Sequence, residues 1–247
     1  MYEEHPDLEK PADENAAIWR YLDFTKFVSL LDRQALFFAQ ADTLPDPFEG
    51  SYPRENVRLR PELHKHLPED ALRKFAFVSR EIRRFTLLNC WHIGENESAA
   101  MWKLYLKTDE GVAIRSTFRR LADSFKACAD RRVYIGKVKY IDYETDSFPE
   151  GKLVYPFVHK RMSFAHECEL RAVIQLLPVP EGLRVNWTKE LSHGGVYVPV
   201  DVDLLLERVF VSPIAPAWFH ELVTSVVRKY GFDKEVRRSK LGEDPVY

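Results

Sequence analysis

Short apolar runs and helical patterns follow one another along the chain in an irregular order. The segment DFTKFVSLLDRQ places apolar side chains at helical spacing behind Asp23, which stands in the N-cap position, and so predicts a helix. AIWRYLDF before it and ALFFAQ after it are typical of strands. The same spacing predicts further helices at about 98–107, 117–128 and 216–230.

Strand patterns dominate the second half of the chain. Six segments are short and rich in β-branched or aromatic residues: RFTLLNCW, GVAIRST, RRVYIGKVKYIDY, ELRAVIQLL, GVYVPVDV and LLERVFVSP. Because strands and helices do not alternate regularly, a doubly wound parallel sheet is disfavoured. The pattern predicts an α+β fold with a mixed, mostly antiparallel sheet flanked by short helices.

The organisation along the chain is simple. Residues 1–15 are polar and contain two prolines, so we expect a flexible lead-in. Residues 16–247 are expected to form a single α+β domain. A highly charged helical insert occupies about 54–84, with interruptions expected at Pro61 and Pro68.

Composition narrows the class of protein. The chain has 36 Lys and Arg against 38 Asp and Glu, and a net charge of -2 gives no reason to expect nucleic-acid binding. Cys90, Cys128 and Cys168 follow no metal or disulfide pattern, which fits a reducing compartment. The N-terminus has no apolar signal region, and no run approaches the ~18 apolar residues of a membrane span. We therefore expect a cytoplasmic protein with no membrane partner.

Two acidic residues, Glu167 and Glu169, stand at the entry to a strongly apolar strand. In a strand, residues i and i+2 point to the same side, so both carboxylates are expected to face one space. Like charges placed in this way raise each other's pKa unless a cation or polar ligand joins them. The pair therefore indicates a functional site, with Lys160, Arg161 and Arg171 as the cations that would neutralise it structurally.

Three other stretches allow both a structural and a functional interpretation. In NCWHIGENESAAMWKLY, Ser98 stands at a helix N-cap, and Trp102 and Tyr105 belong either to a core or to a pocket for a flat ring. In LPDPFEG, Asp46 and Glu49 belong to an ordinary turn, or they bind an arginine or a metal ion. Arg20 and Tyr21 end a strand as a surface pair or as a ligand contact. Phosphate-loop, dinucleotide-fold, nucleophile-elbow and zinc signatures are all missing from the sequence.

Most of the chain resembles the domain-of-unknown-function family 2971 (DUF 2971). The resemblance runs from about Ile18 to the C-terminal SKLGEDPVY and is carried by WRYLDFTKFVSLLDRQALFFAQADTLPDPFEG, NCWHIGENESAAMWKLY with GVAIRST, and FAHECELRAV. The order of parts also resembles the ADP-ribosyltransferase-like fold. Those enzymes have an early Arg or His that contacts NAD, a Ser/Tyr-bearing stretch that holds nicotinamide, and a late Glu, sometimes as Glu-x-Glu. This chain departs from them in its serine-to-aromatic spacing and in lacking a glycine after the first helix.

The second resemblance implies a role for each candidate residue. Arg20, beside Tyr21, would pair with the pyrophosphate or adenosine ribose of NAD. Trp102 or Tyr105 would stack on nicotinamide, and Ser98 would bond its carboxamide. Glu169 would stabilise the oxocarbenium character of the ribose, and Glu167 would orient or deprotonate the nucleophile. The implied function is an NAD-consuming ADP-ribosyltransferase or NAD glycohydrolase whose acceptor the sequence does not identify.

Two alternatives remain open at the level of sequence. A metal-dependent nuclease or phosphohydrolase would use Asp46, Glu49, Glu167 and Glu169 as a Mg²⁺ cage, with Lys160 on the leaving group. A non-catalytic binding or regulatory module would instead use Arg20, Asp46, Glu49 and Glu169 as internal ion pairs that fasten loops to the sheet.

Overall fold

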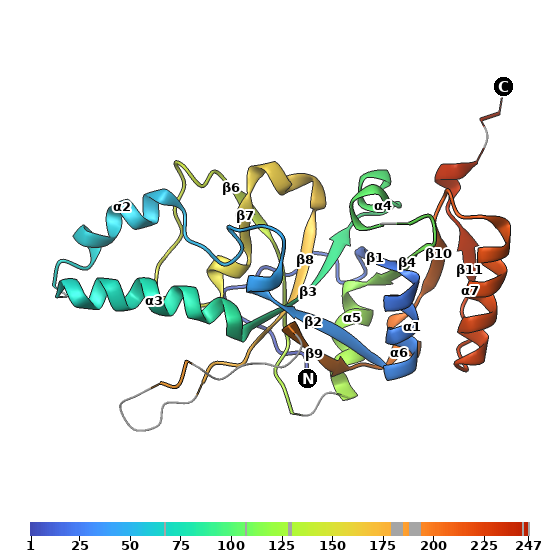
Figure 1. Cartoon of the computed structure of the whole chain (residues 1–247), viewed down its shortest axis with the longest axis horizontal. Coiled ribbons are helices and arrows are strands. Elements are labelled where there is room, and N and C mark those ends of the chain that lie inside the picture. The colour runs from blue at the N-terminus through green and yellow to red at the C-terminus, as the bar shows by residue number, and fades with distance from the viewer. Residues whose placement is uncertain are drawn as a thin grey trace.

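A computed structural model describes residues 1–66, 68–106, 108–127, 130–178, 185–187, 194–243 and 245–246 (Figure 1). Within these residues nine strands form one sheet, and two short strands form a second. The strands are β1 (Ala17–Asp23), β2 (Ala35–Gln40), β3 (Thr86–Ile93), β4 (Gly111–Thr117), β5 (Tyr134–Lys137), β6 (Lys139–Ile141), β7 (His159–Arg161), β8 (Glu169–Gln175), β9 (Gly195–Pro199), β10 (Arg208–Val211) and β11 (Val236–Arg238). The helices are α1 (Phe24–Arg33), α2 (Arg54–Leu63), α3 (Glu69–Phe85), α4 (Ala99–Tyr105), α5 (Phe118–Ser124), α6 (Val202–Leu205) and α7 (Ala217–Lys229).

The large sheet has the strand order β11-β10-β4-β1-β3-β2-β9, and β8 pairs with both β3 and β5. Its pairings are antiparallel except that of β10 with β11. The expectation of an α+β fold with a mixed, mostly antiparallel sheet is therefore confirmed. The three-residue strands β7 and β11 were not predicted, because HKR and VRR carry no apolar alternation.

Strand β3 is shared by two neighbours on one edge. Strand β1 pairs with its end, at His92 and Ile93, whereas β2 pairs with its beginning, at Leu87 and Leu88. Between these two pairings β1 and β2 diverge, and the sheet is split. On its other edge β3 pairs with β8 along the whole segment from Thr86 to His92.

Helix α1 follows β1 directly and leads into β2, so it lies beside the split. The Asp23 carboxylate accepts the Lys26 backbone N–H at 2.9 Å and caps the helix, as its sequence position predicts. Phe27, Leu30 and Leu31 are buried in the main core. This core also holds the inward faces of β1, β3, β4, β8 and β10, which makes the split a break in an otherwise continuous packed layer.

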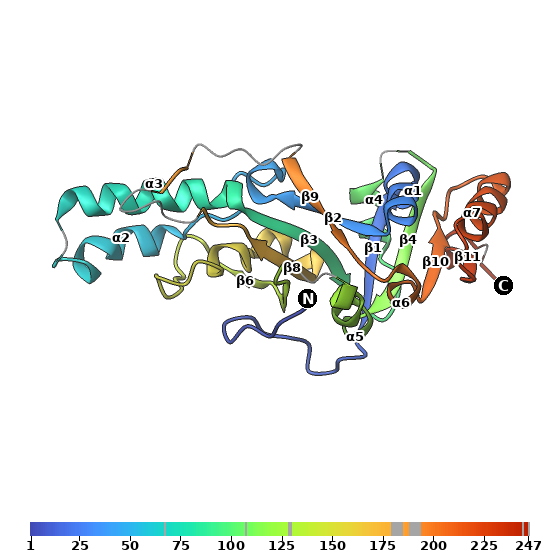
Figure 2. The same cartoon turned by 90° about the horizontal axis from the view of Figure 1, so that it is seen from below.

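Helices α2 and α3 run side by side as an arm that extends away from the sheet (Figures 1 and 2). Pro68 is the N-cap of α3, as expected, but Pro61 does not interrupt α2, which continues to Leu63. Buried polar contacts hold the arm at its base. Asn56 exchanges two hydrogen bonds with the Phe148 backbone, at 2.7 and 3.1 Å, and Arg60 pairs with Glu150 at 2.9 Å.

The first fifteen residues contain neither helix nor strand, but Tyr2 bridges to Val133 and Leu8 is buried. Leu8 packs closely on β5, because a Cβ added at Gly136 would lie 2.7 Å from the Cβ of Leu8. In the part of the chain that the structure describes, no helix combines the length and apolar character that a bilayer crossing requires.

Candidate active site

Arg20 lies at the split in the sheet, on β1. Its guanidinium donates to the backbone carbonyl of Cys90 at 2.8 Å and lies 5.8 Å from the ring centroid of Trp91. Asn89 also spans the gap, because its side-chain amide donates to the Phe37 carbonyl of β2 at 2.9 Å. Polar side chains therefore satisfy backbone groups that a continuous sheet would pair.

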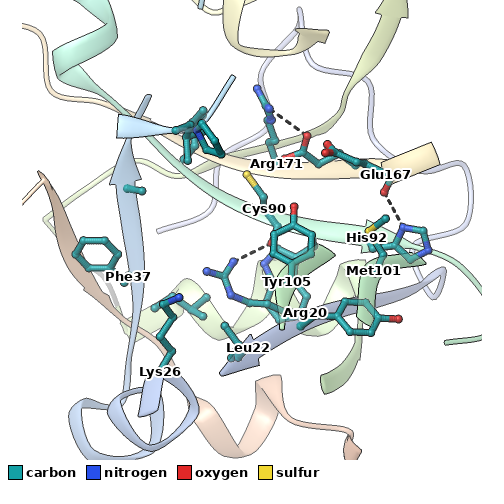
Figure 3. Close-up of a pocket in the computed structure, with 18 of the residues that line it drawn as sticks. Arg20, Leu22, Lys26, Phe37, Cys90, His92, Met101, Tyr105, Glu167 and Arg171 are labelled. Atoms are coloured by element: carbon teal, nitrogen blue, oxygen red, sulfur yellow. Dashed lines mark hydrogen bonds and ion pairs between the residues drawn. The ribbon is translucent and has the colours of Figure 1, made fainter. Parts of the chain in front are cut away.

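A cavity of about 830 Å³ opens at this split (Figure 3). Its volume is within the range of small-molecule sites. Its wall is mostly apolar, formed by β1, β2, β3 and α1, with Tyr105 from α4. The charged side chains that line it are Arg20, Lys26, Asp46, Glu49, Lys160, Arg161, Glu167, Glu169 and Arg171.

Arg20 differs from the other cations of this wall in having no carboxylate partner among the described residues. Lys26, Lys160, Arg161 and Arg171 each pair with an acidic side chain. Burial lowers the pKa of the Arg20 guanidinium, but an arginine starts so high that it stays charged at neutral pH. Arg20 therefore presents a half-buried positive charge, with unused N–H donors, to the cavity.

Arg171 is the centre of a buried ionic network. Its guanidinium binds both oxygens of Glu49, at 2.5 and 2.8 Å, one oxygen of Glu169 at 3.0 Å and the Phe157 carbonyl at 2.7 Å. Lys160 joins Glu169, at 3.4 Å, to Glu167 through a short ion pair. The network thus contains three carboxylates and two cations, and it carries one excess negative charge when all are ionised.

The sequence predicted that Glu167 and Glu169 lie on one strand, but the structure places them on different elements. Glu167 ends a 3-10 helix (Met162–Glu167), whereas Glu169 begins β8. Cys168 between them is left-handed, with φ 41°. This residue breaks the strand spacing, so the carboxylates share a space through their common partner Lys160. The two carboxylates were expected to face one space. They do so because both pair with Lys160, not because of strand spacing.

The two carboxylates have opposite pKa shifts. Burial opposes the ionisation of Glu169, but Arg171 and Lys160 outweigh it and lower its pKa to about 2. Burial raises the pKa of Glu167, and the hydrogen bond from Lys160 offsets this only in part. A carboxylate with a lowered pKa beside one with a raised pKa is the arrangement that separates electrostatic from acid–base roles.

The aromatic residues of NCWHIGENESAAMWKLY divide between the core and the cavity. Tyr105 lines the cavity, and burial followed by the nearby Cys90 thiol and Glu169 raises the pKa of its hydroxyl, which stays protonated. Trp102 is 3% exposed and packs edge-on against Tyr21 at 5.0 Å. Ser98 caps α4 by accepting from Met101 N–H at 3.3 Å. Trp102 and Ser98 are not among the residues that line the cavity.

Tyr21 lies at the edge of the same region and is occupied by a structural contact. It lines the cavity but is only 5% exposed, and its hydroxyl accepts the Ser98 backbone N–H at 2.8 Å. Of the expected cofactor-contacting residues, the fold therefore brings Arg20 and Tyr105 to the cavity wall with the Glu167–Glu169 pair. It places Ser98 and Trp102 behind that wall.

The acidic pair of LPDPFEG has structural partners. Asp46 pairs with Arg161 at 2.8 Å, and Glu49 pairs with Arg171. Among the described residues no group of three or more His, Cys, Asp or Glu side chains is arranged to hold a metal ion. These contacts match the internal ion pairs of the binding-module alternative, with the exception of Arg20. Cys128 lies outside the described residues.

Sequence reasoning did not identify Phe37 and Tyr197, which also line the cavity. Phe37 stands within the apolar run ALFFA of β2, where no polar alternation distinguishes the core face from the cavity face.

Comparisons with known proteins give a distant structural likeness only. No family model matches the sequence, and no curated protein matches it, so the DUF 2971 resemblance stays a prediction.

Structures of Thermus sp. 2.9 DarT are similar to the chain. The complex with ADP-ribosylated ssDNA has 9% identity and TM-score 0.43, covering 96% of this chain and 99% of that chain. The NAD+ complex has 10% identity and TM-score 0.41, covering 95% and 100%. The carba-NAD+ complex has 8% identity and TM-score 0.39, covering 92% and 97%. Likeness at this level carries no conclusion about activity.

Proposed function

We propose that the chain is an NAD-consuming enzyme, an ADP-ribosyltransferase or an NAD glycohydrolase. The observation that carries the proposal is the distribution of charge in the cavity. A guanidinium without a carboxylate partner lies on one part of the wall, and a carboxylate network with one excess negative charge lies on another.

A ligand complementary to this wall carries both signs of charge. NAD+ has an anionic pyrophosphate and a cationic nicotinamide–ribose unit within one molecule. Arg20 would bind the pyrophosphate through its free N–H donors. The excess negative charge beside Lys160 would face the ribose, where positive charge moves onto the sugar as the glycosidic bond breaks. Tyr105 would contact the nicotinamide ring, since Tyr105 is the aromatic residue of the segment 98–105 that lines the cavity.

The proton chemistry would fall to Glu167. When the nicotinamide–ribose bond breaks, its electron pair goes to the ring nitrogen, and the ribose carbon becomes electron-poor. A nucleophile, water or an acceptor, forms the new bond with that carbon and gives its proton to ionised Glu167. Glu169 would stay ionised and, through Lys160, hold Glu167 in place. Both carboxylates remain the proposed catalytic pair: Glu169 supplies negative charge near the ribose, and Glu167 takes the proton.

The test is nicotinamide release from NAD+, together with NAD+ affinity by equilibrium titration. Arg20→Met should weaken NAD+ binding by about 10- to 100-fold, the loss of a charge-assisted contact of roughly 1.5–3 kcal/mol. Glu167→Gln should abolish turnover and leave affinity within about threefold. Arg228→Met and Glu221→Gln, on the exposed face of α7, are the matched controls.

The internal ion pairs at Asp46 and Glu49 favour a second candidate, a non-catalytic module that binds a nucleotide in this cavity. NAD+ binding that depends on Arg20, with no nicotinamide release in the presence of candidate protein and nucleic-acid acceptors, would support that module. If NAD+ neither binds nor is consumed, both candidates are wrong.

A further inference from the structure

We propose that Phe37 and Tyr197 form a second aromatic subsite of the cavity, which binds the base on the far side of the pyrophosphate from nicotinamide. The inference rests on the proposed NAD+ ligand and deepens it. Phe37 on β2 and Tyr197 on β9 are directly paired residues of neighbouring antiparallel strands, so their rings lie on one face. Both line the cavity.

The opposite face of the same strands belongs to the core. Leu36 and Phe38 are 2% and 0% exposed, whereas Tyr197 is 40% exposed. Hydrophobic burial therefore accounts for Leu36 and Phe38 but not for a large aromatic ring left open to the cavity. Small residues flank the two rings. Ala35 and Ala39 line the cavity on either side of Phe37, and a Cβ added at Gly195 would lie 2.6 Å from the tip of the Phe37 ring.

The Tyr197 ring is held in place on several sides. Its centroid lies 5.1 Å from that of Phe37 in an edge-to-face arrangement. The Arg33 guanidinium lies 4.4 Å from the Tyr197 ring centroid, and the Tyr197 hydroxyl hydrogen-bonds the Ser29 hydroxyl at 3.2 Å. Because these contacts fix the ring before a ligand arrives, less side-chain freedom is lost when a flat group stacks beside it.

The position of this pair in the cavity suits a dinucleotide. In Figure 3, Phe37 lies at one side of the view and Glu167 and His92 at the other, with Arg20 and Tyr105 between them. A dinucleotide bound with its pyrophosphate at Arg20 and its nicotinamide–ribose near Glu167 directs its second base toward Phe37. Stacking on an aromatic side chain is how proteins commonly hold such a base.

The experiment uses two half-ligands that separate the two ends of the cavity. ADP-ribose carries the second base and the pyrophosphate, whereas nicotinamide mononucleotide carries nicotinamide and one phosphate. Phe37→Leu and Tyr197→Ala should each weaken ADP-ribose binding by about tenfold. A tenfold change corresponds to about 1.4 kcal/mol, which lies within the range measured for stacking of one base. They should leave nicotinamide mononucleotide affinity unchanged. Trp218→Ala removes an exposed aromatic from α7 and is the control.

The outcomes separate this inference from the proposed function. If ADP-ribose binding weakens as expected but NAD+ is never consumed, the subsite stands and the enzyme proposal fails. If NAD+ is consumed but both variants bind ADP-ribose within twofold of the unmodified chain, the subsite is wrong. Equal losses for the two half-ligands would also overturn it, as would variants that bind ADP-ribose normally and lose only transfer to an acceptor.

Discussion

Replacing Arg171 by methionine tests how the carboxylate network is held. The substitution removes a cation that is 1% exposed and makes three hydrogen bonds to Glu49 and Glu169. Both carboxylates then remain buried, with only Lys160 near one of them. Breaking a buried ion pair from one side costs about 3–5 kcal/mol, because it strands the remaining charge. For a chain of this size the melting temperature should fall by roughly 6–20 °C.

The direction of the pH dependence makes this prediction specific. In the unmodified chain the pKa of Glu169 is lowered, so its contribution to stability is present above its usual pKa and is lost as pH falls toward about 2. In Arg171→Met, Glu169 stays buried but loses the guanidinium that lowers its pKa, so the pKa of Glu169 rises. The free energy of unfolding of the variant should therefore fall as pH rises from 5 to 7, because a buried carboxyl with a raised pKa must ionise. In the unmodified chain the contribution of Glu169 is lost in the other direction, as pH falls.

Urea denaturation at pH 5 and pH 7 measures both effects. Arg54→Met is the matched control, because its ion pair with Glu144 is exposed on both sides and should cost at most about 1 kcal/mol. Adding Glu49→Leu to Arg171→Met should restore part of the loss, since it removes one stranded charge. The reasoning is refuted if Arg171→Met costs under 1 kcal/mol, or if it becomes more stable as pH rises from 5 to 7.

The remaining predictions concern single residues. Cys168→Gly should stabilise the chain by about 1 kcal/mol in urea denaturation, because Cys168 holds a left-handed φ of 41°; no gain relative to Cys168→Ala would contradict this. Ser98→Ala should cost about 1 kcal/mol through the lost helix cap and leave NAD+ affinity unchanged; an affinity loss would restore Ser98 as a ligand contact. If nicotinamide is released, the rate should rise with pH through the raised pKa of Glu167, since the ionised form takes the proton; a flat profile would exclude Glu167 as the base.

The local elements were predictable where one pattern dominates. Asp23 and Ser98 cap the helices that their positions indicate, because a cap depends on residues within one turn. Pro61 shows the limit of local reasoning. A proline is expected to end a helix, but this one lies in the last turn of a helix that buried Arg60 and Asn56 fix to the loop near 148–150. These tertiary partners are about ninety residues away, so no local pattern reveals them.

The candidate site was predictable in its charges but not in its aromatic residues. Glu167 and Glu169 stand out because paired acids beside an apolar strand need cations, and Lys160 and Arg171 are those cations. Trp102 and Tyr105 are three apart on one helix, and the sequence does not decide which faces the cavity. The packing of Trp102 on Tyr21 decides it, and that contact depends on how α4 lies against β1.

The unpaired state of Arg20 is what separates this cavity from an ion-paired interior. Each carboxylate that lines it has a cation, and Arg20 is the lining cation without a carboxylate among the described residues. A half-buried guanidinium bound only to a carbonyl and beside an indole ring is a costly arrangement, because its charge is partly desolvated and not balanced. If Arg20 only filled the gap between β1 and β3, a neutral hydrogen-bond donor would satisfy the Cys90 carbonyl at lower cost. We therefore expect Arg20→Gln to stabilise the ligand-free chain and to weaken the binding of pyrophosphate-containing ligands by about 10- to 100-fold, as for Arg20→Met. Opposite effects on stability and on binding are the expected mark of a residue kept for binding.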